Sequence, residues 1–262
     1  MIPNILQKIV ETKKTEVASA KKYLKDFQYQ ADDNIPALDF KNALKKDTLA
    51  IIAEIKKASP SAGIISPNFN PAEVANAYYA GNVNAVSVLT DREYFKGSPE
   101  YIKTVRPILK NIPILRKDFI INPVQIYEAR ALGADTFLLI SAILTLSEMK
   151  EFIDIGRSLG MEPLVESHSE EELIKTISSS AIIMGVNNRD LRNFTVDLSS
   201  SENLRKIMPE YAISVAESGI NNKEDSLRLK KAEFDAILVG ESLMRSGIEK
   251  CSEKIKELTL MD

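Results

Sequence analysis

The sequence is poor in the residues that build disulfide frameworks and metal centres. Its 262 residues include one cysteine, Cys251, one histidine, His168, and no tryptophan. A single cysteine forms neither an intramolecular disulfide nor a thiolate metal cluster, and this usage suits a reducing cytoplasm, where we expect the protein to work. A lone histidine supplies neither a metal-binding cluster nor a recognisable catalytic triad, so we predict no metal and place His168 at a helix start or on the surface. The absence of tryptophan by itself excludes nothing.

An excess of charge of one sign is also missing. The 34 basic and 37 acidic side chains are interspersed and give a formal net charge of -3, so no basic face for nucleic acid stands out. No apolar stretch approaches the ~20 residues that span a bilayer. The amino-terminal stretch MIPNILQKIVETKK acquires charge too early for a signal peptide. We therefore expect a soluble protein with a small-molecule partner and no nucleic acid or membrane; the sequence leaves the oligomeric state open and allows a monomer.

Short apolar, β-branched runs recur along the chain, separated by stretches of helical length. They begin near Leu49, Asn84, Ile112, Asp135, Met161, Ala181, Ala212 and Asp235. Nearly continuous apolar runs are typical of parallel strands covered on both faces. Eight such units predict an α/β protein, a (β/α)₈ TIM barrel. An open doubly wound sheet is the main rival, and it is disfavoured because no G-x-G-x-x-G turn follows any strand.

Two capping pairs and two glycines support the expected helices. Thr145 with Glu148, and Ser169 with Glu172, have capping-box spacing. Gly133 and Gly160 stand where helices would end before the next strand.

An extension of about 48 residues precedes the first expected strand. Its apolar residues approximate one face of a helix, with most of the lysines elsewhere: Ile5, Leu6, Ile9, Val10, Val17 and Leu24 against Lys8, Lys13, Lys14 and Lys21. The stretch IPALDFKNAL suggests a second, short helix. We expect residues 1–48 to cover one barrel end within a single domain of residues 1–262, although a helix that merely plugs an apolar opening fits the periodicity equally well.

Five of the apolar runs stop on ionic or amide residues. These are Glu54 and Lys56, Lys117, Glu166, Asn187, and Glu217 with Ser218. An unpaired buried charge costs several kcal/mol, so such residues cannot be scattered through a core. The carboxyl ends of parallel strands meet at one rim, and we expect these groups to face each other and a ligand there.

The first of these strand ends carries two opposite charges. Alternation places Glu54 and Lys56 on the same side of the strand, facing the barrel mouth, where an internal ion pair without chemistry is the simpler alternative. The following stretch to Pro71 is long and rich in Pro, Ser, Asn and Gly, which is typical of a lid.

Only one parity of the segment LRKDFI can face inward. Lys117 and Phe119 would line the pocket, whereas Arg116 and Asp118 would point toward the helices. Desolvation would lower the pKa of Lys117 toward neutrality and suit a proton donor or a Schiff-base nucleophile. A simple anion anchor is the alternative.

The later strand ends add a base, an amide and two glycine turns. Glu166 could act as a general base, and Asn187, with Arg189 two residues on, could orient a hydroxyl or carbonyl group. Gly219 and Gly240 follow the last two strands, where this barrel usually binds phosphate. Ordinary helix-start chemistry would also account for these glycines.

Seven segments, in order, resemble indole-3-glycerol phosphate synthase of tryptophan biosynthesis over essentially the whole chain: EIKKASPSAG, SVLTDREYFKGS, LRKDFI, LVESH, GVNNRDL, AESGI and LVGESLMR. The resemblance implies a (β/α)₈ barrel with an extra amino-terminal segment. It also implies conversion of 1-(2-carboxyphenylamino)-1-deoxyribulose 5-phosphate to indole-3-glycerol phosphate, CO₂ and water, without metal or organic cofactor.

The matching motifs imply a role for each site residue. Lys117 resembles the general acid and Glu166 the acid/base of the dehydration, while Lys56, positioned by Glu54, would hold the substrate carboxylate or share in proton transfer. The remaining matches would orient the substrate (Asn187, Glu217 and Ser218), cradle its phosphate (Ser59, Gly219 and Gly240), contact it (Arg189) or wall its aromatic ring (Phe119 and Leu238). A carboxylate at Glu241 would repel phosphate, so we expect Glu241 to offer its backbone N–H and turn its side chain away.

Two other readings stay open at this point. One is a different enzyme on a similar barrel, such as a phosphosugar isomerase or a lysine Schiff-base aldolase. The other is a non-catalytic barrel that binds a sugar phosphate, against which the presence of Glu54, Lys56, Lys117 and Glu166 argues.

Overall fold

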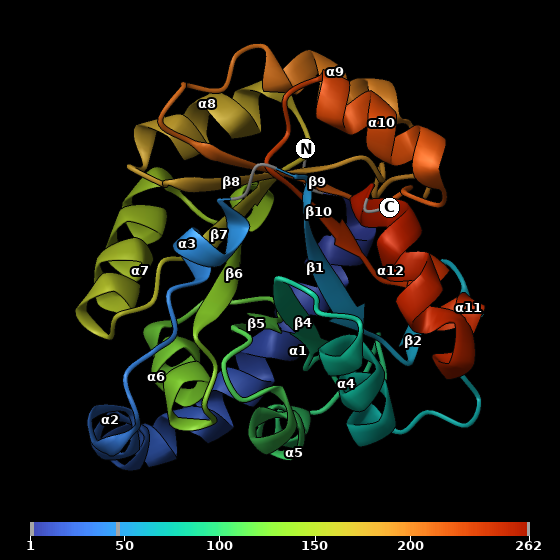
Figure 1. Ribbon diagram of the computed structural model, residues 1–262. Coiled ribbons are helices and arrows are strands. Elements are labelled where there is room, and N and C mark those ends of the chain that lie inside the picture. The colour runs from blue at the N-terminus through green and yellow to red at the C-terminus, as the bar shows by residue number, and fades with distance from the viewer. Residues whose placement is uncertain (1–2, 46–47, 261–262) are drawn as a thin grey trace.

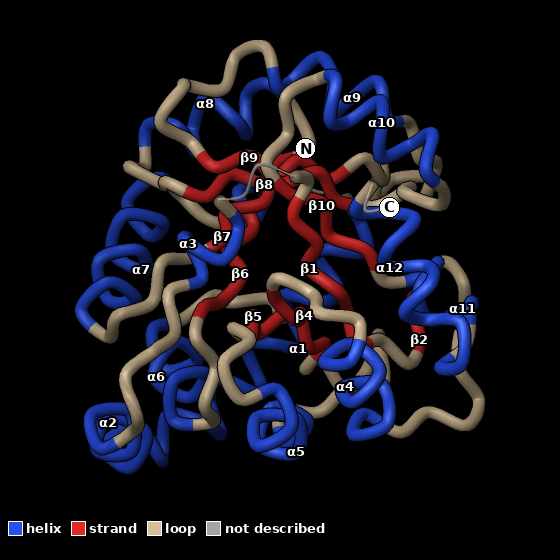
Figure 2. The backbone as a smooth tube through the Cα atoms, viewed as in Figure 1, coloured by secondary structure: helices blue, strands red, loops and turns tan. Residues whose placement is uncertain are grey.

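Eight parallel strands form a closed barrel in the computed structural model, which describes residues 3–45 and 48–260. The strands make an inner ring surrounded by helices (Figures 1 and 2). Around the barrel the order is β1-β10-β9-β8-β7-β6-β5-β4, and β1 pairs with both β10 and β4. Since every barrel strand has two neighbours, the open-sheet rival is excluded and the predicted (β/α)₈ barrel is confirmed.

The barrel strands are β1 (Ala50–Ile55), β4 (Ala85–Leu89), β5 (Ile114–Lys117), β6 (Thr136–Ile140), β7 (Leu164–Ser167), β8 (Ile183–Asn187), β9 (Ile213–Glu217) and β10 (Ala236–Val239). Each begins one to three residues after its predicted start, since the sequence placed the starts near residues 49, 84, 112, 135, 161, 181, 212 and 235. The sequence did not predict the antiparallel hairpin of β2 (Ala58–Ser59) and β3 (Gly63–Ile64), which lies in the segment after β1.

The helices of the amino-terminal extension are α1 (Asn4–Ala20), α2 (Leu24–Asp33) and α3 (Phe40–Leu44). Those of the barrel are α4 (Pro71–Ala80), α5 (Glu100–Leu109), α6 (Pro123–Ala131), α7 (Leu146–Ser158), α8 (Glu170–Ser178), α9 (Leu198–Arg205), α10 (Lys223–Lys231), α11 (Glu241–Ser246) and α12 (Cys251–Thr259). Three 3₁₀ turns complete the described elements: η1 (Lys21–Tyr23), η2 (Ser141–Ile143) and η3 (Ile248–Lys250). No helix in residues 3–45 and 48–260 is long and apolar enough to cross a membrane.

Local sequence signals explain where several helices begin and end. Thr145 and Glu148 form the predicted capping box of α7, and Gly133 and Gly160 take positive φ angles of 96° and 75° just past α6 and α7. After the last strand, Gly247, with φ of 78°, separates α11 from the turn and helix that follow. A positive φ suits glycine and interrupts a helix.

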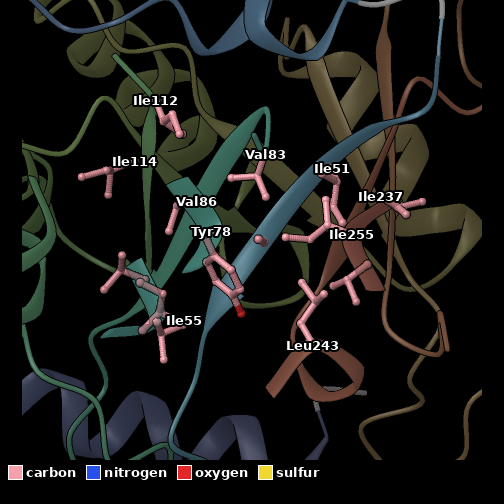
Figure 3. Packing of buried hydrophobic residues seen from close by; sticks show 14 of the residues in the cluster. Ile51, Ile55, Tyr78, Val83, Val86, Ile112, Ile114, Ile237, Leu243 and Ile255 are labelled. Carbon is pink, nitrogen blue, oxygen red and sulfur yellow. The ribbon is translucent and has the colours of Figure 1, made fainter. Parts of the chain in front are cut away.

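Strand alternation divides the buried residues into two sets. Outward residues such as Ile51 and Ile55 of β1 pack against helix residues such as Tyr78 of α4 and Ile255 of α12 (Figure 3). The Tyr78 hydroxyl donates a 2.9 Å hydrogen bond to the carbonyl of Glu54, so this large ring is buried with its polar atom satisfied. The other parity, which includes Glu54, is thereby committed to the barrel interior.

The extension contacts both ends of the barrel. Ile5, Leu6 and Ile9 of α1 line a cavity together with residues at the carboxyl ends of the strands. Phe40 and Leu44 of α3 also pack into the barrel's inner cluster, and α3 immediately precedes the start of β1. In Figure 1, α1 lies behind the barrel and α3 in front of it. The apolar face predicted for the first helix therefore meets the barrel directly.

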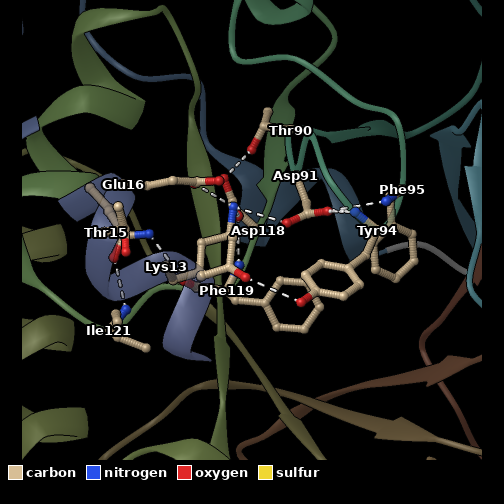
Figure 4. Close-up of polar contacts among 12 residues, drawn as sticks. Lys13, Thr15, Glu16, Thr90, Asp91, Tyr94, Phe95, Asp118, Phe119 and Ile121 are labelled. Atoms are coloured by element: carbon tan, nitrogen blue, oxygen red, sulfur yellow. Dashed lines mark hydrogen bonds and ion pairs between the residues drawn. The ribbon is translucent and has the colours of Figure 1, made fainter. Parts of the chain in front are cut away.

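One lysine on this face is buried, contrary to the sequence interpretation. Lys13 is 1% exposed, and its Nζ lies 3.0 Å from Asp91 Oδ2 and 2.9 Å from Asp118 Oδ1 (Figure 4). We call these three residues the Lys13 cluster. The signal was present, since Lys13 continues the three- and four-residue spacing of Leu6 and Ile9, but lysine was assigned to solvent by default.

The Lys13 cluster anchors α1 to the strand ends. Burial opposes the charge on Lys13, but Asp118 and Asp91 raise its pKa above the ordinary value. Burial likewise opposes the Asp118 carboxylate, yet Arg116 and Lys13 lower its pKa to about 2. Each of these charges is therefore tolerated in the interior because a group of opposite charge is buried beside it.

Replacing Lys13 with Met should destabilise the protein by about 3 kcal/mol, since it leaves Asp91 Oδ2 buried without a cation. Urea denaturation would measure the change. Lys14→Met is the matched control, because Lys14 lies on the same helix in an exposed pair with Glu11 and should give little change. Equal stability of the two variants would contradict the anchoring role.

Candidate active site

A cavity of about 630 Å³ opens at the carboxyl ends of the strands. Every residue that the sequence singled out lines it: Glu54, Lys56, Ser59, Lys117, Phe119, Glu166, Asn187, Arg189, Glu217, Ser218, Gly219, Leu238, Gly240 and Glu241. They come together because the ladder sets residues such as Asn187 and Glu217 side by side on neighbouring strands. The volume is typical of a small-molecule site.

Lys117 lies between two carboxylates. Its Nζ is 2.8 Å from Glu166 Oε2 and 2.8 Å from Glu217 Oε2. Three different strands, β5, β7 and β9, thus contribute one ionisable side chain each to a single contact. As predicted from parity, Arg116 faces away from the cavity and pairs with Glu128 of α6 at 2.7 Å.

The predicted direction of the Lys117 pKa is wrong. Burial does oppose its charged form, but Glu166, Glu217 and Glu54 more than offset burial and raise the pKa of the amine above its ordinary value. The sequence argument considered desolvation alone, whereas two carboxylates at hydrogen-bond distance stabilise the ammonium. The surroundings of Lys117 therefore favour its ammonium form over the neutral amine.

The two glutamates around Lys117 differ in their other partners. Glu166 Oε1 accepts a 3.1 Å hydrogen bond from Asn187 Nδ2 and lies 3.2 Å from His168 Nε2. Burial opposes ionisation of Glu166, but Lys117 and His168 hold its pKa well below the usual value. Glu217 Oε1 is buried with no hydrogen-bond partner among the described residues. Burial and the nearby Glu166 anion raise the pKa of Glu217 to about 8, although Lys117 opposes this shift.

Two glycines make room for the buried carboxylates. A Cβ at Gly185 would collide with Glu217 Oε1, and a Cβ at Gly240 would collide with Glu54 Oε2. Gly240 was predicted as a phosphate neighbour. Gly185 was missed, because the need for glycine there depends on a side chain of the adjacent strand β9.

Glu54 and Lys56 form the ion pair that alternation suggested. Lys56 Nζ lies 2.9 Å from Glu54 Oε2, with the lysine side chain 15% exposed and the glutamate 5% exposed. The pair therefore reaches from the barrel interior toward the cavity mouth, where the ammonium could meet an anion.

The neighbouring part of the rim, after β9 and β10, presents backbone groups and has two arginines near it. Ser218 and Gly219 have φ angles of 67° and 81°, and Gly240 immediately precedes α11. The Glu241 carboxylate lies 2.9 Å from Arg245 and 3.7 Å from Arg189. Its charge is thus shared between two guanidinium groups.

The remaining wall is apolar. Phe119 and Leu238 line it as expected, together with Leu138, Leu191 and the α1 residues Ile5, Leu6 and Ile9. The contribution of α1 could not be assigned to the site from periodicity, which shows an apolar face but not its partner.

His168 does start a helix, as predicted, but it does not lie on the surface. It immediately precedes Ser169, the N-cap of α8, and its side chain is 13% exposed. The expected capping box is incomplete, because Ser169 accepts from the Glu172 amide while the Glu172 carboxylate turns to His168.

Comparisons with known proteins agree with this geometry. Residues 6–258 match the family model described as indole-3-glycerol phosphate synthase. Proteins of that name from Chlorobaculum tepidum and Caldanaerobacter subterraneus subsp. tengcongensis are each 45% identical to the chain. The first alignment covers 92% of this chain and 95% of the relative, and the second 97% and 98%.

The chain belongs to the indole-3-glycerol phosphate synthase family. The solved thiamine phosphate pyrophosphorylase from Pyrococcus furiosus is similar with a TM-score of 0.60 at 19% identity, covering 84% of this chain and 96% of that one. At that identity the likeness shows the fold alone. Residues 3–45 and 48–260 contain no group of three or more His, Cys, Asp or Glu side chains that could hold a metal.

The pKa of Glu217 predicts a pH effect on the stability of this family member. Because it is raised from the ordinary ~4.3 to about 8, its stabilising contribution is complete below about pH 4 and is lost as the pH rises through about 8. Glu217→Gln stays neutral, so its free energy of unfolding should fall less than that of the wild type between about pH 6 and about pH 9. Identical pH slopes would mean that Glu217 is already ionised at neutral pH.

Gly185→Ala should displace the Glu217 carboxylate, at a cost of about 1 to 3 kcal/mol for overpacking. Thermal or urea unfolding would measure it. The double variant Gly185→Ala with Glu217→Ala should recover part of this loss, since the colliding oxygen is gone. If Gly185→Ala left the free energy of unfolding unchanged, the strands would be shown to adjust to the added methyl group.

Proposed function

We propose that this chain catalyses ring closure of 1-(2-carboxyphenylamino)-1-deoxyribulose 5-phosphate to indole-3-glycerol phosphate, with release of CO₂ and water. Its family membership supports this activity. The single observation that carries it is the protonated Lys117 held 2.8 Å from both Glu166 and Glu217 in one cavity.

Ring closure needs a proton for the substrate carbonyl oxygen as the aromatic ring attacks the carbonyl carbon. Lys117 is the general acid of this proposal for two reasons. Its raised pKa keeps the ammonium charged, and the side chain lines the cavity. A positioned cation also stabilises the oxyanion that develops. A Schiff-base aldolase would instead need a neutral amine, which the flanking carboxylates oppose.

Loss of CO₂ then restores the aromatic ring, and dehydration completes the indole. In the proposal, Glu166 takes and returns protons in the dehydration, since it is the ionised member of the glutamate pair. Asn187, Glu217 and Ser218 would orient the intermediate from the neighbouring strand ends.

The charges and walls of the cavity match the three parts of the substrate. Lys56, fixed by Glu54, would hold the carboxylate or share in proton transfer, and Phe119 and Leu238 would flank the ring. Ser59, Gly219 and Gly240 would hold the phosphate, with Arg189 nearby. Glu241 would offer only its backbone N–H, since its side chain faces Arg245 and Arg189. A ligand-bound structure with this carboxylate on the phosphate would contradict that assignment.

We also propose that residues 1–262 act as one domain, with residues 1–48 as its helical extension. Because a single chain lines the whole cavity, a monomer would suffice for activity. We place the enzyme in the cytoplasm, acting on a free small molecule without nucleic acid or an organic cofactor.

The deciding experiment supplies the carboxyphenylamino deoxyribulose phosphate and follows indole fluorescence. Lys117→Ala should lose at least ~100-fold in kcat, the lower range for a positioned acid or base. Lys14→Ala, on the exposed side of α1, is the control. An inactive wild type would refute the function, and full activity of Lys117→Ala would remove this residue from its role. Borohydride trapping of Lys117 with a ketose phosphate would instead support an aldolase.

A further inference from the structure

His168 contacts the site from outside the cavity. Its Nε2 lies 3.2 Å from Glu166 Oε1, and its Nδ1 lies 3.2 Å from Glu172 Oε2. The first separation is an ion-pair contact, since Nε2 has no aligned hydrogen-bond acceptor in the described residues. The imidazole therefore bridges a buried carboxylate of β7 and a carboxylate of α8.

The position of the ring is fixed from both sides. Glu172 Oε2 also accepts a 2.8 Å hydrogen bond from the His168 backbone N–H, so one carboxylate oxygen binds both the amide and the ring. This contact uses the Glu172 side chain that helix-capping rules assign to the N-cap amide. One of the two hydrogen bonds of a capping box is therefore absent, and the Glu172 carboxylate binds the imidazole instead.

Two carboxylates on one imidazole favour its charged form. Burial opposes that charge, yet the adjacent Glu166 and Glu172 carboxylates raise the pKa of His168 to about 10. The charged groups that line the surrounding surface cavity come from α8 (Glu171 and Glu172) and the segment between β8 and α9 (Arg189, Asp190, Arg192 and Asp197). Arg192 pairs with Asp190 at 2.7 Å and Arg189 approaches Glu241, so neither arginine is directed to Glu166.

Glu166 consequently contacts two cations, of which only one takes part in the proposed reaction. Lys117 lies in the cavity and, in the proposed reaction, turns to the substrate and gives up its proton. His168 is absent from the cavity lining and keeps its contact with Glu166 whatever the substrate does. Without His168, the buried Glu166 would lose its second cation and keep the neutral amide of Asn187 as a hydrogen-bond donor.

We infer that His168 is a positioning residue that keeps Glu166 in place and anionic while Lys117 engages the substrate. The inference rests on the proposed function. It assigns a specific task to the one histidine of the chain.

The pairing can be tested without any assay. Since His168 is the only histidine, its imidazole ¹⁵N resonances need no assignment. We expect the wild-type imidazole to stay charged up to about pH 8. In Glu166→Gln, the midpoint of the imidazole titration should fall by about one pH unit or more. Titration of the wild type near the ordinary ~6.5 would overturn the inference.

The role in turnover is tested by the pH dependence of kcat. In His168→Gln the acidic limb should move up by about one to three pH units, so kcat falls most at low pH while KM changes little. Glu172→Gln should shift the limb in the same direction and serves if His168→Gln does not fold. Glu171→Gln, the adjacent residue on the same helix, should leave the limb unchanged.

The possible failures are separable. An inactive wild type would overturn the proposed function and the turnover role of His168 together. An active His168→Gln variant with the wild-type acidic limb would overturn the His168 inference alone, since a merely structural histidine lowers stability without moving that limb.

Discussion

The buried ammonium of Lys117 is the contact on which the site depends. It is stable in the interior only because Glu166 and Glu217 approach it from two other strands, and those carboxylates are tolerated only because Lys117 is there. Barrel closure makes this possible, since β5, β7 and β9 are brought within reach of one another only when the sheet curves into a cylinder. Fold and chemistry are therefore tied by three ionisable side chains that meet only when these three strands close into one barrel.

A second buried ammonium ties the amino-terminal extension to the same rim. Lys13 contacts Asp118, which directly follows Lys117, so the helix α1 is held next to the strand end that carries the proposed acid. Leu6 and Ile9 of α1 then form part of the apolar wall of the cavity. Because the wall and the anchor lie on one helix, substrate contacts and the stability of α1 are coupled.

The sequence predicted well whatever depends on alternation and polarity. The eight strand starts follow from the short, nearly continuous apolar runs. The inward parity of Lys117 and the outward parity of Arg116 follow from strand alternation. It failed where a property depends on partners that only the fold supplies. The pKa of Lys117 and the burial of Lys13 each require knowing which distant carboxylate lies within about 3 Å. The contact of His168 with Glu166, only two residues earlier, requires knowing that the imidazole is buried beside this carboxylate. The space at Gly185 is the same kind of fact, since it is defined by a side chain on β9.

The glycines at 185 and 240 also bear on any attempt to transplant this chemistry. Glu217 and Glu54 occupy the volumes that side chains at these two positions would fill. A designer who grafted only the charged residues onto another barrel would find two carboxylates with nowhere to go, and both would swing out of register with Lys117 and Lys56. Each glutamate must therefore be transplanted together with the glycine beside it on the neighbouring strand.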